Sequence, residues 1–366
     1  MNSLFEQCHV GGLTLRNRIA MAPMTRARAP QGVANDLTAL YYGQRASAGL
    51  IITEGTPISR SAEGFLEIPG IYTPEQINGW RKVTQAVHDA DGVIFSQLWH
   101  VGRVSHVSIQ PEGIAPVSST SQIARNSQAW GMTEQGEPGP VDVSKPRALS
   151  TNEVKEVIAD FAQAAANAIT AGFDGVELHG ANGYLIEQFL NPLVNDRTDE
   201  YRSDTLENRS RFLLEVVDSV VDRIGAQRTS IRLSPFGGLF DMGPYEGIEE
   251  TYLYVADQLS QRGLAYVHFM DQLSRGSSPI PGDFLKKFRS HYRGILILAG
   301  GMTKERAEQF LRDGMIDLAA FGEPFIANPD LVERLKNNWP LLKPDRALSY
   351  GGGAAGYTDY PKHSIT

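Results

Sequence analysis

The feature of this chain that most constrains its fold is a repeat in which a helical stretch ends at a glycine and an apolar, β-rich run follows within a few residues. Glycine suits the left-handed conformation just past a helix end, and short apolar runs rich in β-branched residues are typical of buried strands. The repeat predicts eight strands, over residues 18–22, 50–53, 93–97, 175–178, 230–233, 265–269, 295–298 and 316–321.

The stretches between the predicted strands carry helix start signals. Thr73-Pro74-Glu75-Gln76 combines an N-cap residue, a proline in the first helical position and a capping-box glutamine. Residues 150–153 and 204–207 have the same form, and apolar residues follow the first of them at helical spacing. Apolar strands that alternate with amphipathic helices indicate a parallel sheet covered by helices.

Eight strand–helix units favour a closed barrel over an open, doubly wound sheet, and no G-x-G-x-x-G follows the first strand. The chain is therefore predicted to be an α/β protein, a single (β/α)8 TIM barrel domain over residues 1–366. Residues 1–17 are predicted to form an N-terminal hairpin that plugs the barrel floor. Residues 104–148, which follow the third strand and lack helical periodicity, are predicted to form a lid-like capping insertion, with a passive surface loop as the alternative.

Composition limits the partners and the chemistry. The net charge is −8 and no long run of Lys or Arg occurs, so nucleic acid is not an expected partner. The one cysteine, Cys8, excludes an internal disulfide and any cysteine-held zinc or iron–sulfur centre. Because neither a signal peptide nor an apolar stretch long enough to span a bilayer is evident, we expect a cytoplasmic protein that does not contact membranes.

Polar residues and glycines collect where the predicted strands end, which is where barrels build their active sites. The first strand carries no H-x-H pair and no strand end carries a lysine, which argues against a metal-dependent hydrolase and a Schiff-base aldolase. No metal is expected, and the remaining groups suit an organic cofactor that performs the difficult chemistry itself. These strand-end residues are Thr25, Thr53 to Gly55, Gln97, Trp99, His100, His179, Asn182, Tyr184, Arg232, His268, Gly300, Gly301 and Gly322.

Several segments resemble signatures of the old yellow enzyme family, in the family's order and over essentially the whole chain. This resemblance implies a barrel that binds FMN, accepts hydride from NADPH or NADH, and delivers it to the β-carbon of a small activated alkene. We expect a monomer or a homodimer. The segments are Ala22-Pro23-Met24-Thr25-Arg26, Gln97-Leu98-Trp99-His100-x-Gly102-Arg103, His179-Gly180-Ala181-Asn182-Gly183-Tyr184-Leu185, Leu206-Glu207-Asn208-Arg209, Arg232-Leu233-Ser234-Pro235, Ile326-Ala327-Asn328-Pro329-Asp330-Leu331 and Tyr357-Thr358-Asp359-Tyr360-Pro361.

The resemblance assigns cofactor contacts that suit the residue types. Arg232 would stabilise the negative charge of the reduced flavin near N1 and O2, Gln97 would bind the pyrimidine edge, and Thr25 would donate to O4. The alternatives are a structural ion pair for Arg232, a glutamine that satisfies backbone for Gln97, and a capping hydroxyl for Thr25. The backbone of Pro23, Met24 and Gly55 would approach the ring, and that of Ala299, Gly300, Gly301, Gly322 and Glu323 would hold the phosphate.

His179 and Asn182, three residues apart, would both donate to one carbonyl or nitro oxygen of the substrate, as an oxyanion hole does. Tyr184 would protonate the α-carbon, since tyrosine phenols stay protonated at neutral pH. Core packing is the alternative for a lone His179 and for Tyr184. The same resemblance suggests pocket walls formed by Trp99, Phe65, Phe269 and Tyr350, with core packing an even alternative for the two phenylalanines.

The chain departs from the family at the phosphate end. Where the family usually has an arginine after Phe321-Gly322, this chain has Glu323, which would repel a phosphate if its side chain pointed inward. Lys304 or Arg275 are the cations that we suggest as compensation. The departure keeps a second class open, a catalytically impaired barrel that binds a ligand or a partner. A dienoyl-CoA-reductase-like enzyme is excluded because it would need a cysteine cluster.

Overall fold

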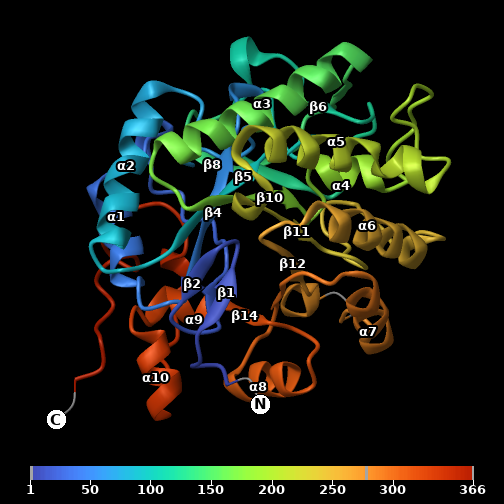
Figure 1. Cartoon of the computed structure of the whole chain (residues 1–366). Helices are drawn as coiled ribbons and strands as arrows, with labels where there is room; N and C mark the ends of the chain where they lie inside the picture. The colour runs from blue at the N-terminus through green and yellow to red at the C-terminus, as the bar shows by residue number, and fades with distance from the viewer. Residues whose placement is uncertain (1–2, 277–278, 365–366) are drawn as a thin grey trace.

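Eight parallel strands close into a barrel in the computed structural model, which describes residues 3–276 and 279–364 (Figure 1). The order around the barrel is β3-β4-β5-β10-β11-β12-β13-β14, and β14 pairs with β3 to close it. Every predicted strand overlaps one of these, so the predicted fold class is confirmed. The strands are β3 (Ile19–Met21), β4 (Leu50–Pro57), β5 (Ile94–Trp99), β10 (Gly175–Gly180), β11 (Thr229–Leu233), β12 (Tyr266–Met270), β13 (Leu296–Ala299) and β14 (Leu318–Phe321).

Helices surround the strands (Figure 1). The predicted capping boxes form at Thr73 and at Ser150, whereas Thr205 only accepts from the amide of Asn208, because Asn208 and not a Glu or Gln occupies the reciprocal position. None of the helices in the described ranges is long and apolar enough to cross a membrane. The α-helices are α1 (Asp36–Gln44), α2 (Pro74–His88), α3 (Thr151–Thr170), α4 (Leu185–Leu190), α5 (Leu206–Ile224), α6 (Ile248–Arg262), α7 (Gly282–His291), α8 (Lys304–Arg312), α9 (Glu323–Ala327) and α10 (Leu331–Asn337).

The N-terminal hairpin plugs the barrel floor, as predicted. Strands β1 (Cys8–Val10) and β2 (Leu13–Leu15) pair antiparallel, and their buried side chains pack with Leu50 and Leu318 at the first residues of two barrel strands. The turn between them requires glycine, because a Cβ on Gly11 would lie 2.1 Å from the carbonyl oxygen of Gln227. The hairpin thus closes the amino-terminal end of the barrel, and the opposite end is left for the site.

Side chains alternate along each barrel strand between the interior and the surrounding helices. On β11, Ile231 belongs to the large apolar layer under the helices, while its neighbour Arg232 lies between His179 and His268 of the adjacent strands. This layer includes Phe161 of α3 and is fully buried at most of its positions. Burying each such side chain stabilises the fold by about 1.5–3 kcal/mol.

The segment over residues 104–148 is more regular than its sequence suggests. Strands β7 (Gln128–Met132) and β8 (Pro138–Asp142) form an antiparallel pair, and β6 (Val117–Ser118) pairs with β9 (Arg147–Ala148). Its apolar side chains Ile109, Ala129 and Val143 share one cluster with Trp99 and Tyr184. The segment therefore packs against the carboxyl ends of β5 and β10. Its role as a cap remains a prediction.

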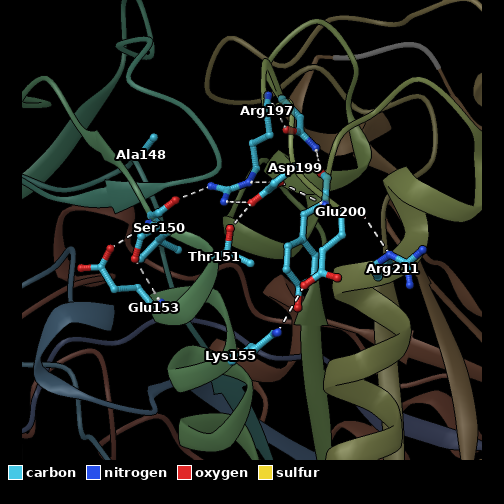
Figure 2. Close-up of polar contacts among 12 residues, drawn as sticks. Ala148, Ser150, Thr151, Glu153, Lys155, Arg197, Asp199, Glu200 and Arg211 are labelled. Atoms are coloured by element: carbon cyan, nitrogen blue, oxygen red, sulfur yellow. Dashed lines mark hydrogen bonds and ion pairs between the residues drawn. The ribbon is translucent and has the colours of Figure 1, made fainter.

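A network of charged and hydroxyl groups ties the start of α3 to the segment that follows α4 (Figure 2). The hydroxyl of Thr151 donates to Asp199 Oδ2 at 2.7 Å, and Arg197 forms an ion pair with Asp199 and donates to the carbonyl of Leu149. Burial alone would raise the pKa of Asp199, but the Arg197 guanidinium brings it down to about 2. The arginine side chain is only 7% exposed, so the pair is a structural one.

Asp199→Asn is expected to lower the free energy of unfolding by about 2 kcal/mol, because it leaves the Arg197 charge poorly compensated. Since the pKa of Asp199 is depressed in the folded state, its stabilising contribution is fully present at pH values above the ordinary pKa of aspartate. It is lost as the pH falls through about 2. Urea denaturation at neutral pH measures the change. Asp204→Asn is the matched control, since its pair with Arg202 is 55% and 45% exposed; equal losses in the two variants would contradict the account.

Candidate active site

Aromatic rings gather at the carboxyl ends of β5 and β10. Trp99 stacks on Phe65 at a centroid distance of 5.5 Å and on His179 at 6.0 Å. Tyr184 meets Trp99 edge-on at 4.9 Å and His179 at 5.0 Å. The structure therefore brings together four of the residues that the sequence predicts for the site. Trp99, His179 and Tyr184 are 3%, 5% and 8% exposed, so this group is largely shielded from water.

His179 is held as a neutral imidazole with a defined proton position. Burial, followed by the positive charge of Arg232, holds the pKa of His179 well below its usual range. Its Nδ1 accepts from the amide of Ala181 at 3.4 Å, so the proton is assigned to Nε2. The imidazole can therefore donate one hydrogen bond from Nε2 throughout the neutral pH range.

Asn182 is fixed by contacts on both its backbone and its side chain. The residue has a left-handed backbone with φ of 59°, and its amide donates to Ser234 Oγ at 2.8 Å. Its Oδ1 accepts from Gln272 Nε2 at 3.2 Å. Because the carbonyl end of the amide faces Gln272, the opposite end, Nδ2, is presented as a donor.

Beneath this group, a buried polar layer crosses the barrel interior. Gln97 Nε2 donates to Glu177 Oε1 at 2.8 Å, and His268 Nδ1 lies 2.8 Å from Glu177 Oε2. Burial lowers the pKa of His268, while burial of Glu177 is outweighed by its partners, His268 first and Arg232 after it, so that the pKa of the carboxyl falls. Since the amide nitrogen of Gln97 is used, its Oε1 is left to accept.

We call the carboxyl-terminal end of the barrel the barrel mouth. Arg232 of β11 lies there, and it is the register partner of His179 on β10 and of His268 on β12. It is 4% exposed, and its Nη2 donates to the thioether of Met270 at 3.2 Å, which is a weak acceptor. The guanidinium thus sits in the barrel interior, close enough to lower the pKa values of His179 and Glu177. That this cation stabilises a reduced flavin stays a prediction.

Glycines follow β13 and β14 at one side of the barrel mouth. Gly300 has φ of 108°, and a Cβ there would lie 1.9 Å from the carbonyl oxygen of Asp271, so only glycine fits. Met24, from the segment after β3, lies near Gly322, since a Cβ on that glycine would be 3.5 Å from the Met24 sulfur. Ala299 is buried and Gly301 is exposed. The predicted phosphate residues and the predicted ring residues therefore meet here.

Of the two cations that the sequence suggests for this end, the structure describes the side chain of Lys304 only. Glu323 is exposed. Lys304 donates to Asn338 Oδ1 at 2.6 Å and lies over the Phe5 ring, and the side chain of Arg275 lies outside the described residues. Instead, Arg306 donates to the carbonyls of Gly300 and Gly301 and pairs with Asp271 at 2.8 Å.

A buried carboxyl group binds the backbone of the segment that follows β3. Residues 23–25 are half-buried at the mouth, and the amides of Arg26 and Ala27 donate to Glu54 Oε2 at 3.0 and 3.3 Å. Burial raises the pKa of Glu54 to about 7. The predicted flavin segment over residues 23–25 is thus followed at once by backbone that Glu54 fixes.

Three residues that were predicted to line the pocket or to contact the flavin lie in other surroundings or at the rim of the barrel mouth. Phe269 is fully buried outside the barrel against Phe284 and Phe288 of α7, because the alternation that turns His268 inward turns Phe269 outward. It does not reach the pocket. At Gly55 the place of a Cβ is taken by the Trp99 ring, at 2.5 Å, so this glycine is required by the indole. Tyr350 is 58% exposed on the rim, where the next residue's amide bonds to the carbonyl of Arg26.

Several residues of the site were not predicted. Glu177 could have been found, since it precedes His179 by two residues on one strand and must share its face. Gln272 belongs to the 3-10 turn η5 (Gln272–Arg275) and contacts Asn182, 90 residues away. Arg306 belongs to α8 and pairs with Asp271, 35 residues away. In the described parts of the chain, no group of three His, Cys, Asp or Glu side chains is arranged to hold a metal.

A surface hollow of about 730 Å³ lies away from this group and is lined by residues of the 192–209 and 245–246 segments. Arg197 and Arg202 border it, and both already form ion pairs within the segment. The polar and aromatic groups converge at the barrel mouth instead, so we place the candidate active site there.

Comparison with known proteins identifies the family. Residues 3–341 match the model of the NADH:flavin oxidoreductase / NADH oxidase family. The chain is 44% identical over 358 residues to 12-oxophytodienoate reductase 1 of Oryza sativa subsp. japonica, covering 96% of this chain and 91% of that protein. It is 41% identical over 362 residues to 12-oxophytodienoate reductase 2 of Arabidopsis thaliana, covering 98% and 95%.

Solved structures of the same fold superpose closely. Morphinone reductase has a TM-score of 0.96 at 45% identity, covering 99% of this chain and 96% of that one. The old yellow enzyme homologue from Zymomonas mobilis has a TM-score of 0.92 at 38% identity, covering 98% and 99%. With a barrel of this topology and a match along nearly its whole length, the chain belongs to the NADH:flavin oxidoreductase / NADH oxidase family and is an oxidoreductase of the old yellow enzyme kind.

Proposed function

We propose that this protein is an FMN-dependent ene-reductase, which uses NADPH or NADH to reduce the activated C=C bond of α,β-unsaturated carbonyl or nitro compounds. The observation that carries the proposal is the pair of donors at the barrel mouth. The neutral imidazole of His179 keeps its Nε2 proton, and Asn182 turns its Nδ2 outward because Gln272 holds its Oδ1. Tyr184 packs beside them.

The residues at the mouth fit a flavin. Gln97 has an acceptor oxygen left after donating to Glu177, which suits the imide N–H of the pyrimidine edge. The buried guanidinium of Arg232 suits the negative charge that reduction places near N1 and O2. Gly300 and Gly301 carry no side chain of their own that would block an approaching phosphate, and Arg306, which donates to their carbonyls, adds a cation beside them.

FMN, when bound, would supply the hydride for the β-carbon of the alkene. His179 and Asn182 would hold the carbonyl or nitro oxygen by two hydrogen bonds, which strengthen as negative charge develops on that oxygen. Tyr184 would give its phenol proton to the α-carbon. Trp99 and Phe65 would wall the pocket and exclude water, which strengthens these hydrogen bonds.

The reductant and the substrate class rest on the relatives. A structure of morphinone reductase in complex with tetrahydroNAD covers 100% of this chain at 45% identity, which supports a nicotinamide nucleotide as the reductant. The plant relatives are named as reductases of 12-oxophytodienoate. The impaired-barrel alternative loses its basis, because the carboxylate of Glu323 is exposed and the His179–Tyr184 group is assembled.

Anaerobic incubation with NADPH and 2-cyclohexen-1-one tests the proposal. We expect cyclohexanone to form in the same amount as NADPH is consumed. No allylic alcohol should form, since the hydride is delivered to the β-carbon and not to the carbonyl carbon. Product analysis by gas chromatography measures both. Carbonyl reduction to the alcohol, or no consumption of either NADPH or NADH, would contradict the proposed reaction.

Glu323→Arg is expected to tighten FMN binding by about three- to tenfold, because it replaces an exposed negative charge beside Gly322 with a positive one and exposed pairs contribute modestly. Titration of the apoprotein with FMN, followed by quenching of flavin fluorescence, measures the dissociation constant. Glu333→Arg, a change at another exposed glutamate, on α10, is the control. Similar affinities for both variants would place the phosphate elsewhere.

A further inference from the structure

The turn that carries Asn182 has an unusual backbone. Asn182 and Gly183 both adopt left-handed φ values, 59° and 79°. A non-glycine residue in this region is uncommon and costs free energy, so surrounding contacts must hold it. The turn is also crowded, since a Cβ on Gly183 would lie 2.6 Å from the carbonyl oxygen of Leu239.

The two amides of this turn are tied to one carboxyl group, that of Gly183 directly and that of Asn182 through a hydroxyl. The amide of Gly183 donates to Glu187 Oε2 at 2.5 Å. The amide of Asn182 donates to Ser234 Oγ at 2.8 Å, and that hydroxyl lies 3.0 and 3.1 Å from the two oxygens of Glu187. Successive amides of a left-handed turn form a concave site that prefers an anion, and Glu187 of α4 supplies it from within the protein.

The surroundings of Glu187 are neutral. The residue is 7% exposed, and Tyr252 of α6 donates to its Oε1 at 3.2 Å. The phenol of Tyr245 is close enough to feel its charge, and Arg209 of α5 faces that phenol ring and Thr251. In residues 3–276 and 279–364, the contacts of the carboxyl group are hydrogen bonds from an amide and two hydroxyls, with no ion pair to an arginine, lysine or histidine.

We propose that Glu187 is a positioning residue whose carboxylate form fixes the Asn182–Gly183 turn and thereby aims Asn182 and Tyr184 at the substrate. The inference rests on the proposed function, since it assigns these two residues to the alkene step. Glu187 touches neither substrate nor cofactor. It acts through the backbone of the turn and through the start of α4, where Tyr184 is the N-cap residue.

Protonation changes what Glu187 can do. A carboxylate accepts from all three donors, whereas a carboxylic acid must donate one hydrogen bond, so the hydroxyl of Ser234 or Tyr252 has to turn away. Burial raises the pKa of Glu187 to about 7, against the opposing hydrogen bonds of Gly183, Ser234 and Tyr252. The change between the two forms therefore falls in the neutral pH range.

The alkene half-reaction should follow this change. In the wild-type protein, the rate of reoxidation of the reduced enzyme by 2-cyclohexen-1-one is expected to rise about tenfold as the pH increases through 7, the equivalent of one well-placed hydrogen bond. Glu187→Gln should stay at the low rate at every pH, and Glu187→Asp should recover a pH step. The rate of flavin reduction by NADPH, measured in each variant, is the internal reference and should not follow this step.

Stability gives a readout that does not depend on activity. Because the folded-state pKa of Glu187 is raised, the protonated form stabilises the fold at low pH, and this contribution is lost as the pH rises through about 7. Glu187→Gln should therefore melt a few degrees above wild type at pH 8 and close to it at pH 5. Glu215→Gln is the control, since Glu215 also accepts from a tyrosine, Tyr201, but lies on α5.

The outcomes separate the two claims. If the wild type reduces the enone and Glu187→Gln shows the same pH step, the positioning role is overturned and the proposed function is left intact. Equal losses in both half-reactions would also overturn it, because they would indicate general damage. A wild-type protein that does not reduce the enone at any pH would overturn the function and this inference together.

Discussion

Tyr184→Phe is expected to slow the reduction of alkenes by about 100- to 10,000-fold, the range that a positioned general acid contributes. The variant removes the phenol proton and leaves the ring, whose edge packs against Trp99 and His179 at 4.9 and 5.0 Å. Reduction of the bound flavin by NADPH needs no proton from Tyr184, so that half-reaction should change little. Stopped-flow absorbance of the flavin measures the two steps separately.

Tyr254→Phe on α6 is the matched control for that prediction, because this half-buried phenol packs beside the apolar layer under the helices and not at the barrel mouth. Its two half-reactions should match those of the wild type. An equal loss in both steps for Tyr184→Phe would contradict the proton-donor role and would favour a packing role for the ring.

His179→Ala is expected to reduce the rate of alkene reduction by about 100- to 1000-fold, the loss found when one donor is removed from an oxyanion hole. The imidazole supplies one of the two hydrogen bonds to the substrate oxygen. Because burial and Arg232 keep it neutral, this contribution should not titrate between pH 6 and 9. Transient kinetics with an enone at several pH values measure both the loss and its pH dependence.

His291→Ala, an exposed change on α7 that breaks only a surface pair with Asp257, should leave the kinetics unchanged. A His179→Ala variant with wild-type rates, or a loss of rate below pH 7 that persists in Glu187→Gln but is absent from His179→Ala, would show that the ring is not the neutral donor described. In that case the substrate oxygen would be held elsewhere.

The barrel was predictable because its signals are local. Each strand is a short apolar run behind a glycine, and the caps at Thr73 and Ser150 mark helix starts within four residues. The order of these elements leaves few topologies once right-handed strand–helix–strand connections are assumed. The hairpin plug followed from the same reasoning, since Gly11 and Gly12 separate two β-like runs ahead of the first strand.

Part of the site was beyond local signals. Gln272 orients Asn182 across 90 residues of sequence, and Arg306 pairs with Asp271 across 35. Phe269 was predicted wrongly. Its position at a strand end suggested that it lines the pocket, but strand alternation directs its side chain toward α7. Strand ends thus indicate where a site lies, while alternation decides which side chains enter it.

The central claim is that the barrel holds FMN and passes hydride from a nicotinamide to an alkene. The most direct test follows the flavin absorbance of the purified protein under anaerobic conditions. We predict a yellow protein that is bleached by NADPH or NADH and that regains its colour when 2-cyclohexen-1-one is added. A protein that takes up no FMN, or a bleached flavin that stays bleached with every activated alkene offered, would contradict the account.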